Sequence, residues 1–476
     1  MVLFEESLNL IGVLILILLF VLGSTYIIRR FHGVEAHVVY SLWRSKKLLK
    51  VFERLRFLAP IVNTISILGA IFGFGILASD FLFMKKQSLP KRLICASIVA
   101  VFLEVFYFFT LRPIVIGAKF TQQYDVILGS AFSVFGVSSF GLLLMLFNGF
   151  HILKGIFTGS TVCPGVAPLI PGVKIPKVPV FIPWYGWIAL LVAMILHEGA
   201  HGIQALKEKF SLKSAGVLLV GVLPIGAFVE PDEDRLKNSK PDKRILTYAA
   251  GPSANLFSIP FFVIIALLFN SHFVAPVYER YYKSYLESVA YVEITNVPET
   301  IPYCNNPSSP AYGILRPGMR ILAVDGNLIK NRVELYNILN TNRLKERNFT
   351  IIDDNKEMTV TIYPNQELPL SPPENFGFTV RDVLKESAQI DNEAKAALTG
   401  LYLIESLLWL CFLLSFLIMI FNFLPIIPLD GGYIASDIYS YYFLGEINEK
   451  NKKIISDLFL IFFFIVAVLN IVPFFI

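Results

Sequence analysis

The chain has 476 residues, of which 55% are hydrophobic and 16% are charged, and its mean hydropathy is +0.64. This composition is far too apolar for a water-soluble domain and indicates an integral membrane protein. The formal net charge of only +5 argues against a nucleic-acid-binding surface and is explained by loop charges that orient helices in the bilayer.

Eight segments are apolar over the roughly 20 residues that a membrane-spanning helix needs. They are 9–28, 58–83, 93–111, 126–150, 183–206, 245–269, 398–425 and 454–475. The first has acidic residues before it, no small-residue cleavage site and a basic loop after it, so we expect a retained helix and not a signal peptide. The sequence therefore predicts an α-helical polytopic membrane protein with about eight transmembrane helices.

Basic residues predict the orientation of these helices. The segment 29–56 is rich in Lys and Arg, so we expect it in the cytoplasm and the N-terminus outside. Alternation then assigns 112–125, 207–244 and 426–453 to the cytoplasm, and 151–182, 270–397 and the C-terminus to the outside. The basic loop 85–92 disagrees, because alternation puts it outside. Either this loop is an exception or 58–111 is not two full spans.

The segment 285–365 has a different pattern, in which apolar residues alternate in short runs between turn signals such as Asp325-Gly326-Asn327. This pattern predicts a small water-soluble β-rich domain inserted between two spans. The expected organisation is an N-terminal transmembrane region (1–155), the first half of a membrane core (156–284), the β-rich domain (285–365), a linker with a polar, helix-compatible stretch (366–397) and the second half of the core (398–476).

The four cysteines do not predict a cysteine-ligated metal site, because no CxxC spacing occurs. Cys95 and Cys411 lie in apolar runs, as core or lipid-facing thiols do. Cys163 and Cys304 lie in polar stretches, and they can pair only if both face the same oxidising compartment.

An HExxH motif, formed by His197, Glu198 and His201, lies inside the apolar segment 183–206. Histidines at i and i+4 lie about 40° apart on one face of a helix, so both can reach one metal ion while Glu198 acts as a general base. A chance match is the alternative. It is disfavoured because an ionisable group in a span costs roughly 2–3 kcal/mol and is rarely without a role.

A catalytic zinc site needs a third protein ligand, and no His or Glu follows in the register of soluble HExxH proteases. Asp430, in a stretch broken by two prolines and followed by Gly431-Gly432, is the best candidate. The alternative is an exposed Asp in a helix-ending turn. Glu104, inside the third span, is expected to partner a basic group. Solvated or interfacial positions are expected for the other histidines, which are His32, His37, His151 and His272.

A second group of residues, Gly251-Pro252-Ser253-Ala254-Asn255, lies in the sixth span. An Asn amide in the bilayer needs partners. Asn255 can hydrogen-bond a substrate carbonyl or a reacting oxyanion, or it can join two helices at a small-residue kink.

The order of these motifs resembles the site-2 protease family of intramembrane zinc metalloproteases. The resemblance rests on HExxH, on GPxxN in the next span and on Leu429-Asp430-Gly431. It covers about residues 160–476 and extends to the PDZ-like segment Ser309–Gly326. Cys163-Pro164-Gly165 and the segment Gly226–Glu230 are similar to the archaeal and eukaryotic branch.

The resemblance implies one Zn²⁺ per chain bound by His197, His201 and Asp430, with Glu198 activating water and Asn255 holding substrate or oxyanion. It implies that the substrates are single-span membrane proteins already cut by another protease. It also implies that the inserted domain is PDZ-like and lies on the extracellular or luminal side.

The loop charges place the HExxH motif and Asp430 together toward the cytoplasmic half of the bilayer. The apolar, Gly-punctuated segment 210–229 between the motifs predicts a re-entrant hairpin whose edge strand can pair with an unwound substrate. Two rival interpretations are a multi-pass scaffold or transporter with a buried metal site, and a membrane zinc protease with an enclosed chamber. The second class uses Glu as its third ligand, whereas this chain offers Leu-Asp-Gly.

Overall fold

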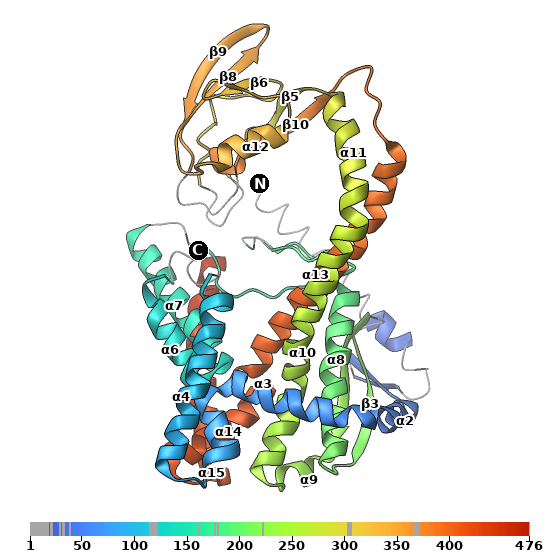
Figure 1. Ribbon diagram of the computed structural model, residues 1–476, viewed down its shortest axis with the longest axis vertical. Helices are drawn as coiled ribbons and strands as arrows, with labels where there is room; N and C mark the ends of the chain where they lie inside the picture. Colours follow the sequence, from blue (N-terminus) through green and yellow to red (C-terminus); the bar gives the residue numbers. More distant parts are fainter. Residues whose placement is uncertain are drawn as a thin grey trace. The chain divides into compact units, whose positions relative to one another are not determined.

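A computed structural model describes residues 19, 22–27, 30, 34–37, 40–113, 122–159, 162–175, 178, 180–220, 223–301, 307–365 and 372–475. The chain divides into two compact units (Figure 1). The first comprises Met1–Phe150, Ile182–Ile265 and Leu407–Leu469, and the second comprises His151–Phe181, Ala266–Ser406 and Asn470–Ile476.

The described part of the chain is mainly helical. Its α-helices are α2 (Lys46–Leu55), α3 (Ala59–Ser79), α4 (Leu89–Phe106), α6 (Asp125–Phe135), α7 (Val137–Thr158), α8 (Gly186–Lys207), α9 (Glu233–Lys237), α10 (Pro241–Phe269), α11 (Ala275–Ser288), α12 (Arg332–Asn340), α13 (Asn392–Phe423), α14 (Asp430–Leu444) and α15 (Glu449–Ile471). Within the described residues, seven helical segments are long and apolar enough to cross a membrane. Each overlaps one of the expected spans after the first, and most of segment 9–28 lies outside the described residues.

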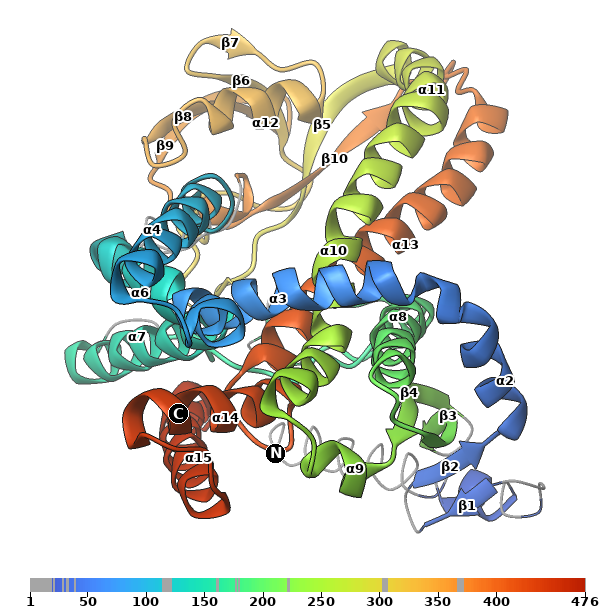
Figure 2. The ribbon, with the colours of Figure 1, turned by 60° about the horizontal axis from the view of Figure 1, so that its bottom comes forward.

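Helix α3 begins and finishes at the same end of the first unit. Near its start, Lys207 Nζ at the end of α8 donates a hydrogen bond of 2.7 Å to Asn63 Oδ1. Just beyond its other end, Lys85 Nζ lies 2.6 Å from Asp242 Oδ1 at the start of α10. The end of α8 and the start of α10 are themselves joined by an ion pair of 3.2 Å. Helix α3 accordingly runs across α8 and α10 (Figure 2), although it is long enough to span.

The expected alternation of loops was therefore wrong in two places. The loop 85–92 lies at the same end as 207–244. This agrees with the alternative expectation that 58–111 is not two full spans. Helix α4 runs away from this end (Figure 1), so Arg112 and Asp125 at its other end, whose Nε and Oδ2 atoms lie 2.7 Å apart, are far from 207–244 and not beside it. Loop-charge counting fails here because it treats every apolar run as one complete crossing.

Two glycines that interrupt helices allow α3 to pack against α6 and α7. Gly75 interrupts α3 at φ +62°, and Gly136 separates α6 from α7 at φ +68°. A Cβ on Gly75 would lie 2.5 Å from the backbone of Ser133 and Val134, and one on Gly136 would lie 2.3 Å from Phe72 O. Only glycine permits both the dihedral angle and the approach. The expected span 126–150 is thus two helices and not one.

A four-stranded antiparallel sheet packs beside α8. Its strands, in spatial order, are β1 (Val34–Ala36), β2 (Tyr40–Arg44), β3 (Leu212–Val220) and β4 (Leu223–Pro231). The hairpin predicted at 210–229 is confirmed as β3 and β4, and the basic segment 29–56 unexpectedly contributes two further strands. Within the described residues, β4 pairs only with β3, so its other edge is unpaired.

The second unit contains the predicted β-rich domain. Its strands are β5 (Val289–Asn296), β6 (Arg320–Val324), β7 (Asn327–Leu328), β8 (Arg347–Asp353), β9 (Lys356–Ile362) and β10 (Thr379–Leu384). The path β10-β5-β6-β8-β9 is antiparallel, and β7 pairs with β6. Strand β10 lies in the segment expected to be a linker, so the sheet extends past 365. Its hydrophobic core includes Phe349, Phe376 and Phe378.

The cysteines fall into two chemical states. Cys95 and Cys411 are free thiols, as expected for residues of apolar runs. Cys163 is disulfide-bonded, and Cys304 lies outside the described residues.

The arrangement of α3 and α4 can be tested by labelling single cysteines in oriented vesicles with an impermeant maleimide. Cysteines at Gln87 and Asn238 should react from the same side, and a cysteine at Gln123 should react from the other. Simple alternation of eight spans requires the reverse, with positions 123 and 238 reacting together and position 87 opposite. That pattern would contradict the crossing of α3.

Candidate active site

The HExxH histidines lie side by side on α8, as their spacing predicts. His197 and His201 are 3% and 9% exposed, respectively, and their Nε2 atoms lie 3.2 Å apart. Helix α8 is an apolar segment of 22 residues that packs against α3 and β4. The imidazoles are therefore held away from bulk water within a segment long enough to cross a membrane.

Asp430 meets the two histidines from a distant part of the chain. It follows His201 by 229 residues, and its Oδ2 atom lies 3.2 Å from Nε2 of each histidine. Asp430 is the first residue of α14. A Cβ on Gly431 would lie 2.4 Å from the backbone of Phe423 and Leu424, so the glycine permits the close return of the chain that directs Asp430 to α8.

These three side chains form a group that can hold a metal ion. Each offers one ligand atom, and the three atoms lie within 4.8 Å of one another. Two imidazole nitrogens and one carboxylate oxygen match the donors of a catalytic zinc site, which leaves a fourth position open. Within the described residues, no other group of three or more His, Cys, Asp or Glu residues comes together in this way.

Helix α10 orients His201 and leaves space for the three side chains His197, His201 and Asp430. The Nδ1 atom of His201 lies 2.8 Å from the carbonyl oxygen of Thr247, and donation to this oxygen leaves the Nε2 lone pair free for a metal. A Cβ on Gly251 would lie 2.3 Å from His201 Nε2 and 2.6 Å from His197 Nε2. The sequence pointed to Gly251 only as part of GPxxN and missed this steric role.

Glu198 points toward β4. Its Oε2 atom accepts a hydrogen bond of 3.0 Å from the backbone N–H of Val229. The carboxylate is thus held by the unpaired edge of the sheet and is not one of the three converging ligand atoms. This is the arrangement expected of a base that acts beside a metal.

A polar network outside the spanning helices holds β4 in place. Glu230 accepts hydrogen bonds from Arg44 on β2 and from Ser214 on β3. Burial alone would raise the pKa of Glu230, but these bonds and the charge of Arg44 lower it overall. The three strands are therefore tied together next to Val229. The contribution of β2 was not visible in the sequence because the partners lie 186 residues apart.

Asn255 is fully buried on α10, one turn after Gly251. Neither Oδ1 nor Nδ2 of its amide has a hydrogen-bond partner within the described residues. Of the two interpretations of Asn255, an interhelical hydrogen bond is therefore not observed there. A buried amide without a partner costs about 1–3 kcal/mol, which is a reason to look for a ligand.

Sequence reasoning missed a buried ion pair that joins α10 to α14. Arg244 donates from Nε and Nη2 to the two carboxylate oxygens of Asp437, at 2.7 and 2.6 Å. Asp437 lies two turns after Asp430 on α14, and Arg244 lies one turn before Thr247 on α10. The pair therefore fixes the helix that carries Asp430 against the helix that orients His201.

Two comparisons identify related proteins. The sequence model of peptidase family M50 matches residues 185–468, a range that contains all the residues described above except Arg44. The chain is also 31% identical over 281 residues to the uncharacterized protein MJ0971 of Methanocaldococcus jannaschii. That alignment covers 58% of this chain and 61% of the relative, so the chain spans about three fifths of the relative's length.

Substitution of Gly251 by alanine should remove the metal without unfolding the protein. The new methyl group would occupy the space in front of both Nε2 atoms and displace at least one imidazole. We expect the metal content, measured by atomic emission on purified protein, to fall at least about tenfold. Gly199 is a matched control in the HExxH motif, because a Cβ there meets nothing within 4 Å. Normal metal content in Gly251→Ala would show that the metal lies elsewhere.

Proposed function

Since the chain belongs to peptidase family M50, a family of membrane metalloproteases, we propose that it is a zinc-dependent intramembrane endopeptidase. It hydrolyses peptide bonds within transmembrane segments of other membrane proteins. The observation that carries this proposal is that Asp430 meets His197 and His201 on α8, a helix of membrane-spanning length, with Glu198 beside them. Polar groups of this kind are costly in a bilayer and are retained for function.

We propose that His197, His201 and Asp430 hold one Zn²⁺ per chain. The fit is supported by the 3.2 Å separations, by the hydrogen bond between His201 and Thr247 and by the missing Cβ of Gly251. Bound there, the ion supplies a Lewis acid that polarises the scissile carbonyl and lowers the pKa of water.

Glu198 acts as the general base in this proposal. Its carboxylate accepts the proton of the attacking water and later delivers it to the amine of the leaving peptide. The N–H of Val229 directs one carboxylate oxygen, so the other is available for the proton. Water excluded by hydrocarbon must reach Glu198 along a polar path, most directly from the near, cytoplasmic face.

The substrate binds in extended form along β4. A transmembrane helix hides each carbonyl in an internal hydrogen bond, so it must unwind before hydrolysis, and the freed backbone groups need new partners in the bilayer. The unpaired edge of β4 offers such partners. It lies next to Glu198, as the contact with Val229 shows. We assign the free amide of Asn255 to the substrate carbonyl or to the oxyanion.

The β-rich domain acts as a PDZ-like filter on the extracellular or luminal side, and the catalytic residues lie toward the cytoplasmic half. The substrates are single-span proteins trimmed first by another protease, and their cleavage is the second step of regulated intramembrane proteolysis. The six strands with helix α12 support the PDZ-like assignment. The orientation rests on the basic character of 29–56.

Substitution of Glu198 by glutamine should abolish cleavage while zinc remains bound, because the amide cannot accept a proton but fills the same space. The measurement is cleavage of a panel of single-span substrates by protein in lipid, together with metal analysis, and a chelator should stop the wild type equally. Glu208→Gln, which neutralises another buried carboxylate just after α8, should keep most of the activity. Full activity of Glu198→Gln would exclude the mechanism.

Substitution of Asp430 by alanine should weaken zinc binding by more than about 100-fold, because loss of even an outer-shell partner of a ligand costs 10- to 100-fold. Competition with a fluorescent chelator measures this on folded protein. If the affinity is unchanged, the third ligand is another residue.

A further inference from the structure

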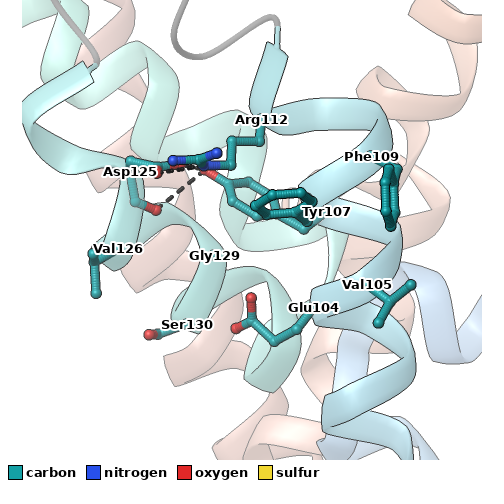
Figure 3. Close-up of a pocket in the computed structure, with 10 residues that line it drawn as sticks. Glu104, Val105, Tyr107, Phe109, Arg112, Asp125, Val126, Gly129 and Ser130 are labelled. Atoms are coloured by element: carbon teal, nitrogen blue, oxygen red, sulfur yellow. Dashed lines mark hydrogen bonds and ion pairs between the residues drawn. The ribbon is translucent and has the colours of Figure 1, made fainter.

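A second polar site lies away from the metal ligands, in a cavity of about 410 Å³ between α4 and α6 (Figure 3). Its polar lining comes from Glu104, Tyr107, Arg112, Asp125 and Ser130. The remaining lining is mostly apolar. None of these residues takes part in the proposed hydrolysis.

Three of the polar side chains form hydrogen bonds or an ion pair with one another at one end of the cavity. Arg112 Nε lies 2.7 Å from Asp125 Oδ2, and the Tyr107 hydroxyl donates to Asp125 Oδ1 at 2.8 Å. Figure 3 shows these three side chains together, with the carboxylate of Glu104 apart from them and beside Gly129 and Ser130. The charge of Arg112 is therefore already matched by Asp125.

Among the described residues, the charge of Glu104 is not matched by a basic side chain. Its carboxylate accepts a hydrogen bond of 2.9 Å from Ser133 Oγ, and within the described residues no basic side chain forms an ion pair with it. The expectation that Glu104 partners a basic group of the chain is thus not met there. Helix α4 belongs to the candidate span Leu89–Leu111, which is little buried within the protein, and in a bilayer an unpaired carboxylate at such a position is costly.

The cavity opens toward the hydrocarbon of that bilayer. At its rim, Phe109 is 72% exposed and Val126 is 80% exposed. The backbone at Tyr107–Leu111 is a π-helix, a local widening that often marks functional sites. Glu104 and Ser130 are themselves exposed, so a ligand that enters from the bilayer reaches the carboxylate beside an apolar rim.

The lining selects an organic cation. A metal ion needs several oxygen or nitrogen ligands, and among the described lining residues only Glu104 offers a carboxylate without an ion-pair partner. A primary ammonium group can donate three hydrogen bonds, and the Glu104 carboxylate and the Ser130 hydroxyl can accept two of them. The Phe108 ring also lines the cavity, but its face already lies 4.9 Å from the Arg112 guanidinium, so the carboxylate and the hydroxyl carry the selection. We propose that this cavity binds the primary ammonium group of an amphiphile, with Glu104 as its counter-ion.

Native mass spectrometry of the full chain released from mixed nanodiscs tests this proposal. Phosphatidylethanolamine carries the primary ammonium, phosphatidylcholine a cation without N–H donors, and phosphatidylglycerol no cation. We expect preferential retention of phosphatidylethanolamine, and a loss of about tenfold or more in Glu104→Gln. Displacement by decylamine would show that the site also accepts a free amine, which supports the same chemistry.

Two further variants separate binding from general damage. Val126→Trp narrows the exposed rim without touching the core and should also lower retention. Glu405→Gln neutralises a carboxylate of α13 that accepts a hydrogen bond from Asn270, and it should leave retention unchanged. Equal retention by wild type and Glu104→Gln would overturn the proposal, as would equal retention of phosphatidylcholine and phosphatidylethanolamine by the wild type.

Discussion

The close approach of His197, His201 and Asp430, with their ligand atoms 3.2 Å apart, is the constraint on which the rest of the first unit depends. Three polar groups at that distance in an apolar interior need a common partner. They also need helices that cannot slide. The buried pair of Arg244 and Asp437 joins α10 to α14, and breaking such a pair costs about 3–5 kcal/mol. The geometry of the ligands is therefore set by the packing of α8, α10 and α14.

Polar groups without a described partner identify where ligands are expected. Most buried polar atoms in proteins are hydrogen-bonded, and here His201 bonds to Thr247 and Glu198 to Val229. The Asn255 amide is an exception at the site, and Glu104 has no counter-charge among the described residues at the cavity. The Asn255 amide suits a peptide backbone, and the Glu104 carboxylate suits an ammonium group. The same rule, that polar groups in an apolar environment need partners, therefore leads to two different ligands.

Close backbone contacts, more than side-chain packing, decide the path of the chain through the first unit. Gly75 and Gly136 let α3 and the α6–α7 break approach each other, and a Cβ on Gly69 would lie 1.8 Å from Ser253 Oγ on α10. Helix α3 thereby lies across α10 close to the GPxxN segment. Such contacts have no signature in hydropathy, which is why an apolar run of sufficient length was counted as a complete crossing.

The sequence by itself determined the membrane class, most of the long apolar helices, the β-hairpin, the inserted β-rich domain and the candidate residues, because hydropathy, alternation and the HExxH spacing are local properties. It also pointed to Asp430, through the broken helix around it and through motif order. Tertiary structure alone decided that Asp430 reaches the two histidines, that Gly251 leaves room for a metal and that β2 supports β4. It also decided that α3 crosses its neighbours. These features depend on contacts between residues far apart in the chain, which no periodicity records.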